Sequence, residues 1–127
     1  MCIRDRLYPG TGEAGERGDF DNVVNAPMRA GDDGVAFRAA FEELILPRLR
    51  AFRPDLLLIS AGFDAHTRDP LGHIDLEAED FSWVTKQLME IADRHAGGRI
   101  VSVLEGGYDL EGLAESAAAH VRALMRG

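Results

Sequence analysis

The sequence has little cysteine, little positive charge and no long hydrophobic run, and each shortage excludes a class of protein. Cys2 is its one cysteine, so we expect no disulfide framework and a reducing compartment such as the cytoplasm. No apolar run approaches the ~20 residues of a membrane-spanning helix, and the start lacks the apolar core of a signal peptide. Lysine and arginine total 14 against 22 aspartates and glutamates, a net charge of −8. This charge argues against a nucleic-acid partner and suits a cationic substrate, and the lack of a spanning run argues against a membrane partner.

What the sequence does have is the composition of a single folded domain. Its 127 residues are 46% hydrophobic and 28% charged, which argues against disorder and allows a modest core. The first six residues, MCIRDR, resemble the translation of a transposon-end adapter used in sequencing libraries. We therefore expect residues 1–6 to be foreign to the protein, and the domain to occupy residues 7–127.

Two short apolar runs predict the sheet. Residues 56–60 and 99–104 lack alternation, which is typical of parallel strands covered on both faces. A further short strand is expected at residues 22–27, NVVNAP. Because strands and helices are expected to alternate, the pattern predicts an α/β fold, a parallel sheet flanked by helices.

Apolar residues recur at helical spacing in three segments. The first begins after Asp32, a suitable N-cap, and contains Pro47, which predicts a kink or a break. The second covers Phe81 to Ala92 and should end at the following glycines. The third begins after Asp109, which can also cap a helix.

Polar residues crowd the loops that follow the two predicted strands. The first strand enters SAGFDAHTRDPLG, residues 60–72, and the second enters EGGYDL, residues 105–110. Parallel strands present their carboxyl ends at one edge of a sheet, where α/β proteins bind ligands. Asp64 and Tyr108 should therefore lie near the same edge. The phenol of Tyr108 could donate a hydrogen bond to a developing oxyanion, or the ring could simply pack.

Asp64 and His66 have the side chains of a zinc site but are too few to complete one. A catalytic zinc ion takes three protein ligands, and these two residues supply at most two. Asp64 could equally bond its own backbone as a turn residue, and local spacing leaves both interpretations open. His73, His95 and His120 are scattered along the chain, so the residues alone do not predict a complete metal site.

Three motifs, LYPGTGE, ISAGFDAHTRDPLG and VLEGGYDL, occur in this order and make the sequence resemble the histone deacetylase superfamily of zinc amidohydrolases. The similarity is to bacterial members of the class II type, including acetylpolyamine amidohydrolases and acetoin-utilisation-type proteins, and it runs from about residue 7 to the end. The resemblance implies the C-terminal portion of an arginase/deacetylase-like fold. It also implies Zn²⁺-dependent removal of acetyl groups from acetylated lysine or acetylpolyamine amines.

The resemblance assigns roles to individual residues. Asp64 would be one of three protein ligands of the zinc ion, and Tyr108 would polarise the scissile carbonyl and stabilise the oxyanion. Leu71 and Gly107 would line the tunnel for the acylated substrate. Tyr8 would be a tunnel aromatic at a position where the family usually has phenylalanine.

Other parts of the family pattern are not matched in this sequence. The His-His pair that supplies the general base and the Asp-x-His pair that supplies two zinc ligands would lie upstream. His66 is not a ligand in the family pattern, so His66 and Asp69 would shape the loop. A non-catalytic α/β module that binds a small ligand at the same edge is the alternative, and the oligomeric state is left open.

Overall fold

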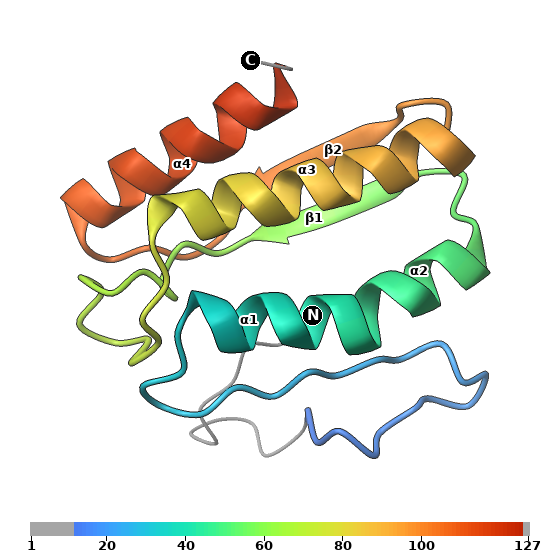
Figure 1. Ribbon diagram of the computed structural model, residues 1–127, viewed down its shortest axis with the longest axis horizontal. Helices are drawn as coiled ribbons and strands as arrows, with labels where there is room; N and C mark the ends of the chain where they lie inside the picture. Colours follow the sequence, from blue (N-terminus) through green and yellow to red (C-terminus); the bar gives the residue numbers. More distant parts are fainter. Residues whose placement is uncertain (1–11, 126–127) are drawn as a thin grey trace.

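The computed structural model describes residues 12–125 and contains the expected parallel sheet with flanking helices (Figure 1). Its strands are β1 (Leu57–Ala61) and β2 (Ile100–Leu104), which pair in parallel with Leu57 opposite Ile100. The other elements are α1 (Gly34–Ala40), η1 (Phe41–Ile45), α2 (Leu46–Phe52), α3 (Ala78–His95) and α4 (Leu110–Leu124). Because the two strands run parallel, with α3 as the connection between them, their carboxyl ends lie at the same edge of the sheet.

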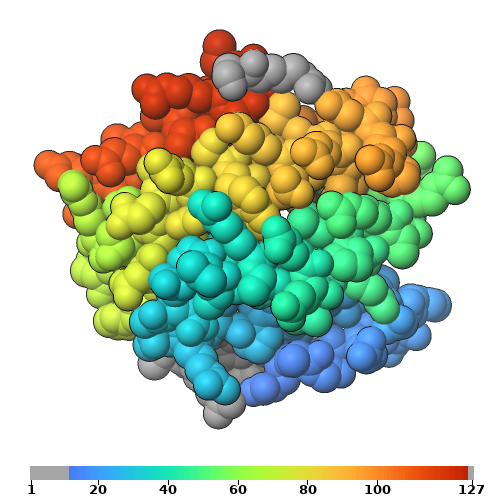
Figure 2. Space-filling view, in the orientation of Figure 1, coloured from blue at the N-terminus to red at the C-terminus, as the bar shows by residue number. Residues whose placement is uncertain are grey.

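The helices α3 and α4 cover one face of the β1–β2 pair. Figure 2 shows α1–α2, α3 and α4 packed side by side in one continuous surface. Leu57 is 7% exposed on the covered face, whereas Leu58, next to it in β1, is 71% exposed. Val101 and Val103 of β2 are exposed on the same open face as Leu58. The expectation that both faces are covered is therefore wrong for residues 12–125, because the described helices leave one face open.

A continuous helical segment precedes the sheet, and its middle is a π-helical turn. The N-cap is Asp33 rather than the expected Asp32, and its carboxylate accepts the N–H groups of Val35 and Ala36. Pro47 lies in the first turn of α2, directly after η1. Proline cannot donate a backbone hydrogen bond, and the helix widens just before it. The break expected at Pro47 is thus a local change of helix type, without an end to the helix.

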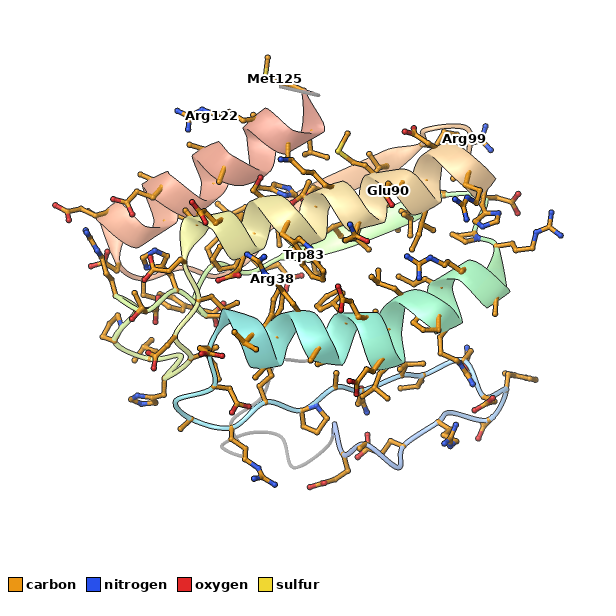
Figure 3. The ribbon with its side chains drawn as sticks, in the orientation of Figure 1. Arg38, Trp83, Glu90, Arg99, Arg122 and Met125 are labelled. Carbon is orange, nitrogen blue, oxygen red and sulfur yellow. The ribbon has the colours of Figure 1, made fainter. Side chains whose placement is uncertain are left out.

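The first helical segment packs on α3 through aromatic and ionic contacts. Arg38 donates from Nε to Asp80 Oδ1 at 2.9 Å, and its guanidinium lies 5.4 Å from the centre of the Trp83 ring (Figure 3). Asp80 also completes a capping box with Glu77 at the start of α3. The rings of Phe37 and Trp83 meet edge to face at 6.5 Å. These contacts fix α1 against the helix that carries the chain from β1 to β2.

The strand expected at residues 22–27 is absent, and this part of the chain is irregular. Val23 donates its N–H to Arg17 O at 2.9 Å, and the Asn25 side chain donates to Glu13 O at 3.0 Å. Ala26 is buried in the core. The Val23 N–H is therefore used in a local contact and not in a strand ladder. Separately, within residues 12–125 no helix is both long enough and apolar enough to cross a membrane.

Candidate functional site

The loops that follow β1 and β2 lie against each other at the carboxyl edge of the sheet. Phe63 donates its N–H to Gly106 O at 2.8 Å, which continues the strand pairing beyond β1. Tyr108 donates its N–H to Asp69 Oδ2 at 2.7 Å. The Phe63 ring packs edge to face on Phe81 of α3, with 5.2 Å between ring centres. The structure thus brings the two polar loops together, as the parallel topology predicts.

Asp64 sits in a space that neighbouring glycines leave open. A Cβ atom on Gly106 would lie 2.9 Å from Asp64 Oδ1, and one on Gly72 would lie 1.7 Å from the Asp64 carbonyl oxygen. Any side chain at these two positions would displace the aspartate. Within residues 12–125 the Asp64 carboxylate has no hydrogen-bond or ion-pair partner. The backbone contacts of a turn aspartate, one of the two interpretations left open by the sequence, are therefore absent at Asp64.

Asp69 has the contacts that Asp64 lacks. The residue is 8% exposed, and its carboxylate accepts the N–H groups of Leu71 at 2.9 Å and Gly72 at 3.2 Å. These bonds define an Asx-type turn, and the third bond, from Tyr108, joins that turn to the other loop. The sequence indicated only that Asp69 shapes its loop. The Asp-Pro-Leu-Gly spacing signals the turn, but no local signal indicates the bond to Tyr108.

His66 is buried beneath the loop. It is 1% exposed, and a Cβ atom on Gly112 of α4 would lie 2.7 Å from its Nδ1. Nδ1 accepts the Arg68 N–H at 3.2 Å, so in the neutral ring Nε2 carries the proton. Nε2 lies 3.9 Å from Glu115 Oε2 and 4.0 Å from Glu77 Oε2. His66 therefore packs the loop onto α4, which agrees with its expected loop-shaping role.

The remaining residues of the predicted site surround the two loops. Leu71 is 58% exposed and Tyr108 is 61% exposed. Gly107 has a φ of +138°, and a Cβ atom there would lie 3.0 Å from Leu113 Cδ1. Tyr8 lies outside the described residues. Leu71 and Tyr108 thus present their side chains to solvent, while Asp69 bonds the backbone N–H of each.

The described residues do not form a complete metal site. Within residues 12–125 no group of three histidine, cysteine, aspartate or glutamate side chains could hold a metal ion. Asp64 is a suitable oxygen donor for zinc, and its carboxylate lacks a competing partner. The described residues can therefore supply one zinc ligand, Asp64, but not a complete zinc site.

A second buried histidine lies behind the site, in the core. His120 of α4 has Nδ1 2.7 Å from Thr85 Oγ1 and Nε2 2.9 Å from Ser102 Oγ. Because the Thr85 hydroxyl donates to Phe81 O at 2.5 Å, its oxygen is left to accept from Nδ1–H, and Nε2 accepts from Ser102. Burial lowers the pKa of His120 below its ordinary value of 6.5. The network holds α3, α4 and β2 together around a neutral imidazole.

Comparison with known proteins identifies the relatives of this chain. The family model described as "Histone deacetylase domain" matches residues 3–124. The chain is 48% identical over 118 residues to an uncharacterized protein of Synechocystis sp., covering 93% of this chain and 37% of that protein. It is 39% identical over 125 residues to "Histone deacetylase 14, chloroplastic" of Arabidopsis thaliana, covering 96% and 30%. It is 41% identical over 101 residues to the "Histone deacetylase-like amidohydrolase" of Pseudomonas aeruginosa, covering 80% and 27%.

Solved structures agree with these relatives. The HD domain of HDA15 superposes with a TM-score of 0.84 at 38% identity, covering 94% of this chain and 34% of that one. The histone deacetylase Clr3 superposes with a TM-score of 0.87 at 34% identity, covering 95% and 21%. The chain thus spans about a third or less of the relatives that it matches.

Proposed function

The chain belongs to the histone deacetylase family, and from this premise we propose that its two strand-end loops form part of a zinc-dependent site that removes acetyl groups from acetylated lysine or polyamine amines. Membership supports a hydrolase of amide bonds, because the relatives are named deacetylases and an amidohydrolase. The net charge of −8 supports a cationic substrate. We keep the cytoplasm as the proposed location, although some relatives are named chloroplastic.

The observation that carries this proposal is the difference between Asp64 and Asp69. Asp69 is bound by three backbone N–H groups, whereas within the described chain Asp64 has no such bond. A carboxylate that the fold leaves without a partner, at the ligand-binding edge of a parallel sheet, is available to a metal ion. When bound, zinc supplies Lewis acidity toward the acetyl carbonyl. Its other ligands and the general base would come from outside the described residues.

In this proposal Tyr108 donates its phenolic O–H to the former carbonyl oxygen as negative charge develops there. Such donors stabilise the transition state more than the bound substrate. The exposed Leu71 would contact the aliphatic part of the acylated amine. Gly107, which precedes the tyrosine, lets the backbone approach that group closely. The 127-residue chain alone is expected to show no turnover, because one carboxylate cannot build the zinc site.

A hybrid domain tests the proposal. In it, the segment of this chain that aligns with histone deacetylase 14 of Arabidopsis thaliana, 96% of the chain, replaces its counterpart in that relative, which supplies the remaining parts of a deacetylase domain. We expect the hybrid to bind zinc and to release acetate from acetyl-lysine or acetylpolyamine reporters. Hybrids with Asp64→Ala or Tyr108→Phe are the matched controls. A folded, zinc-loaded hybrid without turnover would contradict the proposal and favour a non-catalytic ligand-binding module.

A further inference from the structure

Asp69 is a buried carboxylate that holds both strand-end loops. Its Oδ1 accepts the N–H groups of Leu71 and Gly72 and so closes the turn that contains it. Among the described residues its Oδ2 accepts one N–H, that of Tyr108, at 2.7 Å and across a separation of 39 residues in sequence. The two oxygens therefore have separate roles. One orders the loop after β1, and the other fixes the backbone of the loop after β2.

This bond ties the backbone of Tyr108 to the loop after β1. It follows Gly106 and Gly107, whose backbones are the least restricted sterically, and its own side chain is 61% exposed. Within residues 12–125 Tyr108 makes no other hydrogen bond. A bond to a carboxylate is roughly twice as strong as one between neutral groups, and burial of Asp69 protects it from competing water.

We propose that Asp69 is a positioning residue, which sets the place of the Tyr108 phenol relative to Asp64 and Leu71. The inference rests on the proposed function for what the phenol does. It adds that the loop carrying the metal-ligand candidate and the loop carrying the oxyanion donor are held in register by one carboxylate. Asp69 itself touches neither substrate nor metal in this scheme.

Asp69→Asn separates the two roles, because the amide has one acceptor oxygen and one donor nitrogen. The oxygen is expected on the side of Leu71 and Gly72, where it keeps two bonds. The amide nitrogen then faces the Tyr108 N–H, donor against donor, and that single bond is lost. Asp75→Asn is the matched control. Asp75 lies in the same loop and is exposed, and within residues 12–125 its carboxylate has one hydrogen-bond partner, the Thr67 hydroxyl at 3.4 Å.

The first measurement is hydrogen exchange at the Tyr108 amide of the 127-residue chain. We expect slow exchange in the wild type and in Asp75→Asn, although the tyrosine is exposed, and faster exchange in Asp69→Asn. The amides of Leu71 and Gly72 should stay protected in all three. If Asp69→Asn does not fold, the exchange rate of the Tyr108 amide in the wild type tests the proposal by itself. Exchange at Tyr108 as fast as in an unstructured peptide overturns the proposal.

The second measurement is turnover in the hybrid domain. Asp69→Asn should lower kcat on the order of 10²-fold, as expected for a reacting group misplaced by about 1 Å, with zinc content unchanged. In a Tyr108→Phe background the same change should cost no more than about twofold, because the group that it misplaces no longer contributes. An equal loss in both backgrounds shows a merely structural role and overturns the inference. An inactive wild-type hybrid instead contradicts the proposed function, and the exchange rates still decide whether Asp69 holds Tyr108.

Discussion

The loop between β1 and α3 contains Asp64 and Asp69, and the fold treats the two differently. Asp69 is 8% exposed and accepts three backbone N–H groups. Asp64 is partly buried among glycines and has no polar partner within residues 12–125. The difference separates a structural carboxylate from an available one. A structural carboxylate accepts hydrogen bonds from the backbone of its own protein, whereas an available carboxylate has no such partner and can bind a ligand.

The largest expected effect concerns Tyr108, the residue that Asp69 holds. In the hybrid domain Tyr108→Phe should lower kcat on the order of 10²–10³-fold, about 2.7–4 kcal/mol, because one donor to the developing oxyanion is lost. The Michaelis constant should change less than kcat, since ground-state contacts remain. Steady-state kinetics and metal analysis measure both quantities. A kcat within about twofold of the wild type, far short of that loss, would make Tyr108 a packing residue.

A smaller effect separates the two aspartates by stability. In the 127-residue chain Asp69→Ala should lower the free energy of unfolding by about 1–3 kcal/mol, because three part-buried backbone N–H groups lose their carboxylate acceptor. Asp64→Ala should change it by no more than about 0.5 kcal/mol, since the described chain loses no hydrogen bond or ion pair. Urea denaturation of the two variants measures the difference. Equal losses would show that Asp64 is also a structural residue, and the comparison would fail.

The smallest effect lies behind the loops, at His120. Its pKa is lowered by burial, so the unfolded chain binds a proton at pH values where the folded chain keeps this ring neutral. Its contribution to stability is therefore full above about pH 6.5 and is lost as the pH falls toward the lowered pKa. Melting temperatures at about pH 7.5 and about pH 5.5 should differ more for the wild type than for His120→Gln. An identical pH dependence in both proteins would contradict the neutral core histidine.

The sequence predicts the elements of this fold well, because their signals are local. Strands expected at 56–60 and 99–104 are found at Leu57–Ala61 and Ile100–Leu104, and Asp109 caps α4 as expected. The predictions are wrong where contacts outside the element itself determine the local structure. Asp33 caps α1 because the Asp32 carboxylate accepts the Arg29 N–H and the Asp32 carbonyl accepts the Asp75 N–H.

The same limit applies to the candidate site. Topology alone places Asp64 and Tyr108 at one edge of the sheet, so their proximity follows from the order of strands and helices. The bond from Tyr108 to Asp69 joins residues 39 positions apart, and no spacing rule indicates it. The open face of the sheet was also unexpected, because apolar residues such as Leu58 and Val103 have the pattern of buried strands.

The most direct test of the difference between available and structural groups is zinc content in the hybrid domain with Asp64→Ala and with His66→Ala. These residues lie two positions apart, and both have side chains that zinc accepts. We predict that Asp64→Ala loses zinc and turnover together, whereas His66→Ala retains stoichiometric zinc because its ring packs against α4. Metal analysis that shows zinc retained in Asp64→Ala and lost in His66→Ala would contradict the account.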